Sequence, residues 1–248
     1  MNRKILIIGG TSGLGRKLAE LYCKENCLVG ILGRRQALLQ EFAKLYPNQA
    51  KICHADISSE DAEQRISDFI DEMGGFDIFI CTASVIHFNN EMDLKTELDT
   101  LATNINGFTK SIQAAYKYCK KNNKGQIVIV SSVAAGRGNK TAPAYNASKA
   151  FQSSYTEGIR LKIKSEKINA SVTEIIPGYM DTGMAKGDRL FWMASIEKAA
   201  QQTKRAIEKK KRRAFITKRW WLIYQAYRLM PSFIYDRLIN SKISFKRK

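Results

Sequence analysis

Residues 4–15 read KILIIGGTSGLG, and this stretch decides the fold class. A short apolar run, residues 5–8, leads directly into a glycine-rich turn and then into a helix-like segment from Arg16 to about Glu25. A strand, a glycine turn and a helix begin a nucleotide-binding βαβ unit, because glycines let the backbone approach a pyrophosphate whose charge meets the helix N-terminus. The stretch therefore predicts dinucleotide binding at one edge of a parallel sheet.

The second predicted strand, residues 28–32, ends at Gly33-Arg34-Arg35. An acid usually stands here to bind the ribose 2′-hydroxyl of NAD, but the chain has no Asp or Glu between Cys27 and Gln40. Two arginines suit a 2′-phosphate, so the sequence favours NADP, and Arg34 is the better candidate because it is nearer the strand end. The alternative is that both arginines are solvated at the start of a helix.

The remaining apolar runs extend the same α/β pattern. They predict further strands at 51–55, 78–80, 127–130, 170–176 and 214–217, and helices at 36–46 and 97–121 and around Tyr145. Residues from 179 to about 210 predict one or two mobile helices over the site. We expect a single-domain doubly wound (Rossmann) fold over residues 1–217, with a mostly parallel sheet of about seven strands flanked by helices, followed by an extension over 218–248.

Tyr145 and Lys149 carry the clearest chemical signal. Four residues apart on a helix, their side chains lie on one face, where an ammonium near a phenol favours the phenolate. The tyrosine then exchanges a proton nearer neutral pH than a free phenol does. Ser132 follows the predicted strand 127–130, so its hydroxyl is placed to donate to a substrate oxygen in the crevice.

Two further polar positions leave alternatives open. Asp56 follows the third predicted strand and fits either an adenine site or the N-cap of the next helix. Asn104 lies inside the helix 97–121, where its poor helix propensity indicates a packing or functional reason, with solvent exposure as the alternative.

Together these residues resemble the short-chain dehydrogenase/reductase family, in order, over residues 3 to about 182. Gly9, Gly13 and Gly15 fit its glycine motif, Asp56 its adenine-site acid, and Pro177-Gly178 with Thr182 its nicotinamide-side motif. The catalytic set of the family is matched by Asn104, Ser132, Tyr145 and Lys149. The cofactor-binding set that the resemblance and the motifs imply is Gly9, Thr11, Ser12, Gly13, Leu14, Gly15, Arg34, Arg35, Asp56, Ile57, Ala83, Tyr145, Lys149, Pro177, Gly178 and Thr182.

The resemblance implies NADP(H)-dependent interconversion of a carbonyl and a secondary alcohol. Tyr145 would act as the acid/base and Ser132 would polarise the carbonyl. Lys149 would hold the nicotinamide ribose and depress the pKa of Tyr145. Asn104 would position a proton-carrying water, and Thr182 would bind the carboxamide. No metal is implied. The family also implies a homodimer or tetramer through the helices that carry Asn104 and Tyr145.

The chain departs from the family pattern at two places. Ile8 stands where the family often has Thr, and Thr82-Ala83-Ser84 replaces the usual Asn-Ala-Gly after the fourth strand. Ser84 brings a β-carbon to a place where backbone normally approaches the cofactor.

Composition bounds the cellular setting. No apolar run reaches membrane-spanning length, and the N-terminus enters a strand at once, so we expect no signal peptide. The five cysteines lie in predicted strands and helices, which favours reduced thiols and a cytoplasmic protein. Cys23 and Cys27 have helical spacing, but no second Cys/His pair completes a metal site.

The C-terminal region carries most of the charge. Residues 204–248 hold 15 Lys and Arg and two acids, so they account for +13 of the net charge of +18. In residues 218–239, aromatic and aliphatic residues recur at helical spacing among the basic ones, interrupted at Pro231. This pattern fits a segment that binds the inner face of an anionic membrane, or a helix that packs on its own domain or on a partner subunit. Binding of nucleic acid is less favoured, because no recognised nucleic-acid-binding motif accompanies the charge.

A membrane site would favour a lipophilic carbonyl substrate, with Phe191, Trp192 and Met193 lining an apolar pocket. The competing function is a non-catalytic NADP-binding sensor or scaffold, docked through the basic tail.

Overall fold

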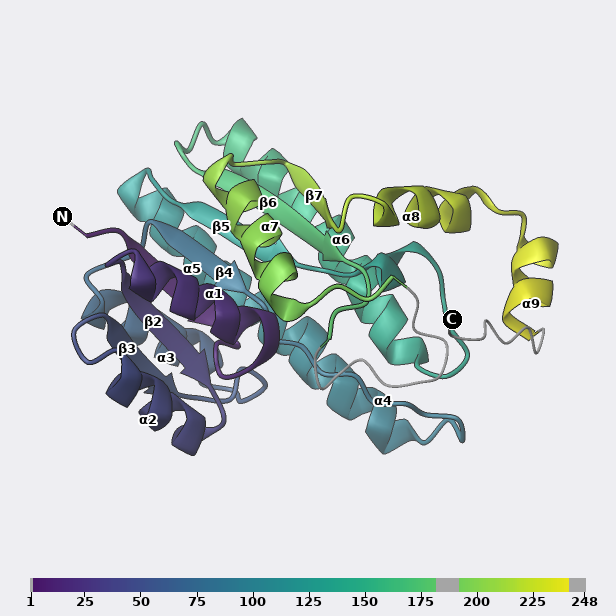
Figure 1. The fold of residues 1–248 in the computed structure, drawn as a ribbon, viewed down its shortest axis with the longest axis horizontal. Coiled ribbons are helices and arrows are strands. Elements are labelled where there is room, and N and C mark those ends of the chain that lie inside the picture. The colour runs from purple at the N-terminus through teal and green to yellow at the C-terminus, as the bar shows by residue number, and fades with distance from the viewer. Residues whose placement is uncertain (1, 182–191, 241–248) are drawn as a thin grey trace.

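The computed structural model describes residues 2–181 and 192–240 (Figure 1). Its centre is a seven-stranded, fully parallel sheet of order β3-β2-β1-β4-β5-β6-β7, which confirms the predicted doubly wound fold. The strands are β1 (Lys4–Ile8), β2 (Leu28–Gly33), β3 (Ala50–His54), β4 (Ile78–Cys81), β5 (Gln126–Val130), β6 (Ser171–Pro177) and β7 (Arg213–Ile216).

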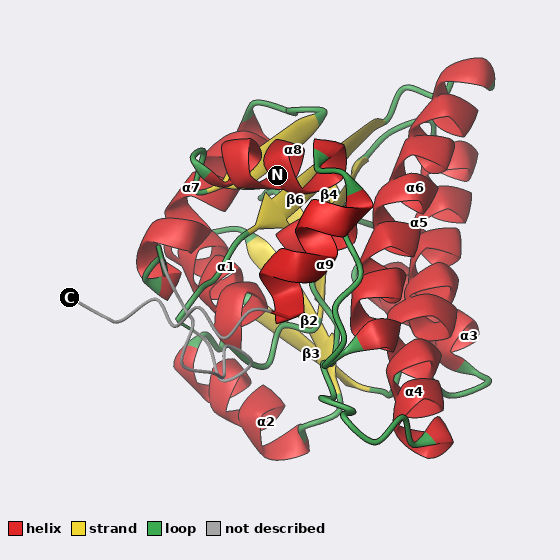
Figure 2. Cartoon of the chain, turned by 90° about the vertical axis from the view of Figure 1, so that its right-hand side faces the viewer, coloured by secondary structure: helices red, strands yellow, loops and turns green. Residues whose placement is uncertain are grey.

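Helices cover both faces of the sheet, as Figure 2 shows. One face is covered by α1 (Gly13–Lys24), α2 (Gln36–Leu45) and α7 (Ile196–Glu208), and the other by α3 (Ala62–Glu72), α5 (Phe108–Asn122) and α6 (Pro143–Ser165). Successive strand residues point to opposite faces, so Ile5 and Ile7 of β1 join one core cluster whereas Leu6 and Ile8 join the other. Burial on both sides explains why residues 5–8 of β1 are all apolar.

The predicted helix over 97–121 is interrupted. The chain forms α4 (Leu94–Leu101), a π-helical segment (Ala102–Gly107) and then α5. A β-carbon at Gly107 would lie 2.7 Å from the main-chain oxygen of Ile57, so glycine permits this segment to approach the loop after β3. The sequence does not predict the wider π-helical turn, because tertiary packing and not helix propensity selects it.

The segment 179–210 differs from the expectation of mobile helices over the site. Its described helix, α7, buries Ala199, Thr203 and Ile207 in the layer beside α1. The apolar side of α7 faces the sheet, so this helix is part of the hydrophobic core and not a cover over the site. Phe191 and residues 182–190 lie outside the described residues.

Residues 218–240, here called the C-terminal arm, form α8 (Trp220–Leu229) and α9 (Ser232–Asn240) on either side of Pro231, as the sequence predicts. Trp220 and Tyr224 of α8 are buried on the arm's own domain. Trp220 lies directly against Gly178, and Tyr224 packs against Gly136. Among the described helices, none combines the length and apolar character that crossing a bilayer requires.

Candidate active site

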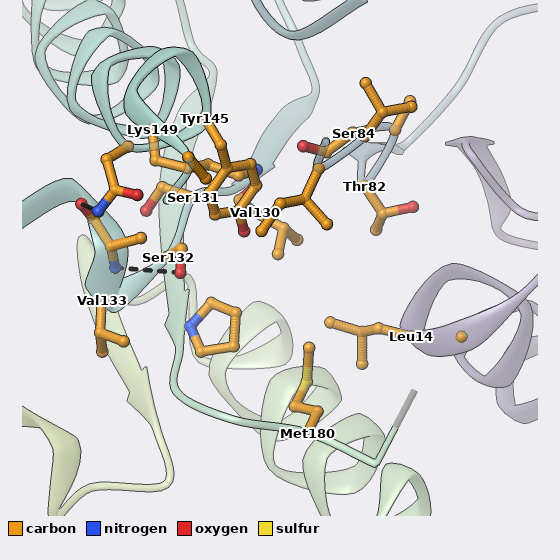
Figure 3. Close-up of a pocket in the computed structure, with 18 of the residues that line it drawn as sticks. Leu14, Thr82, Ser84, Val130, Ser131, Ser132, Val133, Tyr145, Lys149 and Met180 are labelled. Atoms are coloured by element: carbon orange, nitrogen blue, oxygen red, sulfur yellow. Dashed lines mark hydrogen bonds between the residues drawn. The ribbon is translucent and has the colours of Figure 1, made fainter. Parts of the chain in front are cut away.

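One large cavity, of about 1820 Å³, runs along the carboxyl ends of the parallel strands, which is the ligand side of such sheets. Every cofactor-binding residue expected from the sequence lines it, except Thr182, which lies outside the described residues. Figure 3 shows Leu14, at the start of α1, across the cavity from Ser132 and Tyr145, with Met180 below them. The glycine turn and the Tyr145 helix therefore face the same space.

The glycine turn is held tightly against the end of β4. Gly9 has φ +89°, and a β-carbon there would lie 2.6 Å from the main-chain nitrogen of Ala83. Thr82 replaces the family's asparagine, and its hydroxyl donates to the main-chain oxygens of Ile8 and Gly9 at 3.0 and 3.2 Å. Thr82 thus ties the turn to β4 at the position where the sequence departs from the family.

The two arginines after β2 occupy different surroundings. Arg35 donates to the hydroxyl of Thr11 from Nε and Nη2, at 3.1 and 2.7 Å, and to the hydroxyl of Ser12 from Nη2, at 2.5 Å. Arg34 pairs with the carboxylate of Asp56 at 3.4 Å. The guanidinium of Arg35 is bound by neutral hydroxyls at the glycine turn, so its charge is less compensated than that of Arg34.

Asp56 closes a turn and does not cap a helix. Its Oδ1 accepts hydrogen bonds from the main-chain nitrogen and hydroxyl of Ser58, at 2.9 and 2.7 Å, whereas α3 begins after Asp61. Burial acts to raise the pKa of Asp56, but hydrogen bonds from Ser58 and Arg34 outweigh it, so this pKa lies below its ordinary value. An ionised Asp56 therefore stands in the cavity wall, where the resemblance puts an adenine contact.

Ser132 and Tyr145 meet at the end of β5. The hydroxyl oxygen of Ser132 accepts from the main-chain nitrogen of Ala134 at 3.1 Å and thereby fixes the turn after the strand. Burial raises the pKa of Tyr145, and a hydrogen bond with Ser132 partly opposes that rise. The expected depression of this pKa by Lys149 is not what the structure has, because the dominant influence on the phenol is loss of solvent.

Lys149 is buried, with its Nζ 5.7 Å from the centre of the Tyr145 ring. The Nζ donates to the main-chain oxygen of Val130 at 3.2 Å and to Oε1 of Gln152 at 2.9 Å. Burial lowers the pKa of Lys149 to about 8. A lysine that titrates near neutral pH, beside a phenol and facing a cavity, has the properties of a group tuned for proton chemistry.

Asn104 lies behind the cavity wall, fully buried in the π-helical segment. Its Oδ1 accepts from the hydroxyl of Ser84 and the main-chain nitrogen of Val85, at 3.0 and 2.8 Å, and its Nδ2 donates to the main-chain oxygen of Val85 and the hydroxyl of Ser148. The side chain therefore holds the 84–85 loop against α6. Ser84, whose β-carbon raised the question of fit, turns its hydroxyl to Asn104.

The far end of the cavity is built by the C-terminal arm. Its lining there comes mainly from apolar and aromatic side chains: Trp192, Trp220, Ile223, Tyr227, Tyr235, Leu238 and Ile239. Arg137 fastens the arm, because its Nε donates to the main-chain oxygen of Tyr227 at 2.9 Å, its Nη2 donates to that of Met230, and its guanidinium lies 4.8 Å from the Tyr235 ring centre.

The sequence alone does not point to Arg137 or Gln152 as site residues. Gln152 carried a usable signal, because it lies three residues after Lys149 on the same helix face. Arg137 lies in a loop far from the arm in sequence, so only the folded chain shows their contact.

The residues at the strand ends fit an anionic dinucleotide at one end of the cavity. The glycine turn, the start of α1 and the guanidinium of Arg35, which within the described residues contacts only neutral hydroxyls, favour phosphate groups there. In contrast, no group of three or more His, Cys, Asp or Glu side chains within residues 2–181 and 192–240 is arranged to hold a metal.

Comparisons with known proteins agree with this arrangement. Residues 3–215 match the family model for short chain dehydrogenase. The chain is 31% identical over 192 residues to 11-beta-hydroxysteroid dehydrogenase 1A of Arabidopsis thaliana, covering 74% of this chain and 54% of that protein. It is 32% identical over 185 residues to an uncharacterized oxidoreductase of Myxococcus xanthus, covering 72% of each. The chain thus spans about half the length of the plant relative.

Solved structures show the same fold. A short chain dehydrogenase from Burkholderia cenocepacia in complex with NADP superposes with a TM-score of 0.82 over 97% of this chain and 98% of that one, at 18% identity. ElxO with NADP bound superposes with a TM-score of 0.72 over 81% and 89%, also at 18% identity. At such identity the likeness concerns the fold alone, whereas the family match covers most of the sequence. The chain belongs to the short-chain dehydrogenase/reductase family, oxidoreductases whose typical cofactor is NAD(P).

Proposed function

We propose that the chain is an NADP(H)-dependent oxidoreductase that interconverts a carbonyl and a secondary alcohol on a lipophilic substrate. The observation that carries the proposal is the convergence of Ser132, Tyr145 and Lys149 on the cavity that also holds the glycine turn. A phenol, an ammonium and a hydroxyl in one cavity suit proton transfer at an oxygen atom.

The proposed roles follow from the contacts of each group. A bound nicotinamide supplies or accepts the hydride. Tyr145 gives a proton to the substrate oxygen in reduction and takes it in oxidation. Ser132 donates a hydrogen bond to the same oxygen and stabilises the charge that develops there. Lys149 binds the nicotinamide ribose and replaces the proton that Tyr145 gives up.

Asn104 has a supporting role in this proposal. Its side chain orders the 84–85 loop and Ser148, so it places the catalytic helix relative to the loop beside the cavity. Its main-chain oxygen is the group by which it connects to Lys149, through Gln152. Thr182 is proposed to bind the carboxamide of the nicotinamide, as the family motif implies.

The preference for NADP over NAD rests on Arg35 and Arg34. Arg35 lies on the hydroxyls of the glycine turn with little compensation of its charge, and a 2′-phosphate would provide that compensation. Arg34, held by Asp56, borders the same end of the cavity. The two solved structures with NADP support the preference by fold likeness.

A lipophilic substrate is favoured by the lining that the C-terminal arm provides. Trp220, Ile223 and Leu238 present apolar surface at the end of the cavity away from the glycine turn. Burial of apolar substrate surface there yields binding energy in proportion to its area. A large hydrophobic carbonyl compound fits this end better than a small polar one.

The outer side of the same arm favours an anionic membrane as its partner. Trp220, Ile223, Tyr224 and Tyr227 recur at helical spacing on the inner side of α8, so Trp221, Leu222 and Leu229 lie on the outer side. Leu229 is 80% exposed, and Phe233 of α9 is 75% exposed.

Basic side chains surround this exposed apolar surface. Lys218, Arg219, Arg228 and Arg237 are exposed on the arm, which carries a single acid, Asp236, within residues 218–240. Exposed apolar residues bordered by cations suit the headgroup region of an anionic bilayer. We therefore propose that residues 218–248 dock the protein on such a surface, beside the apolar end of the cavity.

Co-sedimentation with vesicles at low salt tests the membrane contact. The wild-type chain is expected to bind vesicles that contain phosphatidylserine and to leave phosphatidylcholine vesicles unbound. The double variant Leu229→Glu, Phe233→Glu is expected to lose binding, whereas Leu45→Glu, at a 59% exposed position on α2, keeps it. Wild-type protein that stays in the supernatant with both vesicle types would rule the contact out.

We also propose a homodimer or tetramer through the face formed by α4, α5 and α6. Exposed apolar residues on this face include Leu94, Leu98 and Leu161. Sedimentation equilibrium measures the assembly, and a monomer at all concentrations would contradict it.

A non-catalytic NADP-binding scaffold is the competing function, favoured by the extent of the basic arm. The deciding experiment is a screen of ketones and alcohols that follows NADPH, with Tyr145→Phe as the comparison. The proposal expects carbonyl-dependent NADPH oxidation that Tyr145→Phe reduces by about 10²- to 10⁴-fold. Equal rates for the two proteins would remove Tyr145 from the reaction, and tight NADPH binding with no turnover would favour the scaffold.

A further inference from the structure

Lys149 is connected to the π-helical segment by a single buried side chain. Nζ of Lys149 donates to Oε1 of Gln152 at 2.9 Å, and Nε2 of Gln152 donates to the main-chain oxygen of Asn104, also at 2.9 Å. Gln152 is 1% exposed and Lys149 is 3% exposed. The bridge therefore lies in a region of low dielectric constant, where hydrogen bonds are strong and unpaired polar groups are costly.

The orientation of the Gln152 amide follows from its partners. A main-chain oxygen only accepts, so the amide nitrogen must face Asn104, and the amide oxygen must then face Lys149. An ammonium only donates, which requires the same orientation. The oxygen of Gln152 is thus held toward the ammonium by a contact on another structural element.

The titratable groups that face Lys149 are Cys81, at the end of β4, and Tyr145, one turn earlier on α6. Burial raises the pKa of the Cys81 thiol to about 12, so this group is neutral near physiological pH. No ion pair within the described residues includes Lys149. Val130 and Gln152 are therefore its neutral acceptors, and Gln152 is the closer of the two.

We propose that Gln152 is a positioning residue that fixes the Nζ of Lys149 toward the cavity and sustains its charged form. The inference rests on the proposed function, in which Lys149 binds ribose and returns a proton to Tyr145. Of the three N–H bonds of the ammonium, two donate to Val130 and Gln152, so the third is directed to a ligand in the cavity that Lys149 lines.

Substitutions of Gln152 are expected to change the pKa of Lys149 in a direction that depends on the new side chain. A hydrogen-bond acceptor stabilises the ammonium, so its removal lowers the proton affinity of Lys149, and a carboxylate in its place raises that affinity. Gln152→Met removes the acceptor at similar volume. Gln152→Glu keeps the shape and adds charge.

The chain offers a matched control in Gln126. This residue is also buried, and its Nε2 also bridges two acceptors, the hydroxyl of Thr173 at 2.9 Å and the main-chain oxygen of Ile207 at 3.0 Å. Gln126 is not among the residues that line the cavity. Gln126→Met therefore removes an equivalent structural bridge without touching Lys149.

The test is an NMR titration of the lysine ε-methylene groups in the full chain, with the signal of Lys149 assigned from its loss in Lys149→Arg. Compared with wild type, the midpoint of Lys149 is expected to fall in Gln152→Met and to rise in Gln152→Glu, by about tenfold in proton affinity. Gln126→Met leaves it unchanged. The alkaline limb of the pH profile of kcat/KM moves in the same directions.

Two failures are separable, because the titration needs no turnover. An unchanged Lys149 midpoint in both Gln152 variants would overturn the role of Gln152, whatever the activity. The midpoint of Lys149 could instead shift in a protein that reduces none of the tested carbonyl compounds. That result would uphold the link between Gln152 and Lys149 and would remove the proposed reaction.

Discussion

The two ends of the cavity are built in opposite ways. At the glycine turn, neighbours in sequence form the wall, and Arg35 lies on the hydroxyls of Thr11 and Ser12 with its charge available. At the arm, the wall comes from residues far apart in sequence, and the guanidinium of Arg137 donates hydrogen bonds to the main-chain oxygens of Tyr227 and Met230. An arginine on neutral hydroxyls is suited to bind an anion, whereas an arginine on carbonyl oxygens holds a wall in place.

This difference separates local from long-range construction. The glycine-turn end is formed mainly by β1, the turn and α1, which are continuous in the chain, and Thr82 ties this stretch to the end of β4. The arm end needs the loop around Arg137 and the helices after Trp220 to meet. We therefore expect changes at the first end to affect cofactor binding, and changes at the second to affect the substrate alone.

The largest effect is expected where the two ends meet, at Lys149. Burial lowers its pKa from 10.5 to about 8. Between pH 8 and 10.5 the unfolded chain keeps the Lys149 proton that the folded chain has lost, so the free energy of unfolding rises with pH. Below pH 8 both states carry the proton, and the full cost of burying the charged ammonium remains. Lys149→Met should remove a rise on the order of 3 kcal/mol between pH 8 and 10. Urea unfolding across this range measures it, and parallel curves for the two proteins would refute the buried ammonium.

The glycine turn is expected to show the next largest effect. A β-carbon at Gly15 would lie 2.5 Å from the main-chain oxygen of Gly9, whereas one at Gly158 on α6 has no neighbour within 4 Å. Gly15→Ala should cost about 1–3 kcal/mol through overpacking and weaken NADPH binding by up to roughly 100-fold. Gly158→Ala should stabilise slightly through helix propensity. Calorimetric titration measures the affinity of both variants for NADPH. Equal affinities for Gly15→Ala and Gly158→Ala would contradict the proposed role of the glycine turn in binding the cofactor.

Arg34 and Arg35 are expected to contribute unequally to NADPH binding at the glycine-turn end of the cavity. Arg35→Ala is expected to reduce affinity for NADPH by roughly 10- to 100-fold, because it removes charge-assisted hydrogen bonds to a phosphate. Arg34→Ala should have a smaller effect, because Asp56 already compensates its charge. Affinity for NADH should change little in either variant. A larger loss in Arg34→Ala than in Arg35→Ala would reverse this ranking and return to the one that the sequence favoured.

The smallest effect is expected at the arm. Arg137→Met releases the arm from its loop and should lower kcat/KM for an apolar carbonyl compound by about tenfold, since a hydrogen bond of this kind contributes about 1.5 kcal/mol. NADPH affinity should stay the same. Arg65→Met is a suitable control, because Arg65 also donates to a main-chain oxygen, that of His54, outside the cavity. Equal kinetics for both variants would show that Arg137 does not shape the substrate end.

Prediction from sequence succeeded where chemistry is local. The parallel strands, the glycine turn and the placement of Tyr145 and Lys149 on one helix face are consequences of periodicity and short spacing. It was incomplete where packing overrides propensity. The π-helical segment at Asn104 depends on Gly107 lying against Ile57, and the burial of α7 depends on α1, which no local pattern encodes.

The pKa of Tyr145 is the clearest case of a correct residue with an incorrect electrostatic expectation. Spacing placed Lys149 beside the phenol, and from that the sequence predicted a lowered pKa. Burial raises it instead, because removal from water penalises the phenolate more than its neighbours favour it. Residue spacing carries no information about the depth at which a group is buried.

The amino-acid sequence by itself determined the parallel α/β fold, the family, and the glycine turn with Tyr145 and Lys149 at the cavity, because these depend on periodic apolar runs and on motifs a few residues long. Only the tertiary structure decided that Arg137 fastens the arm, that Gln152 connects Lys149 to Asn104, and that α8 walls the cavity. These contacts join residues that are remote in the chain or buried to different depths, and close packing in three dimensions is what selects them.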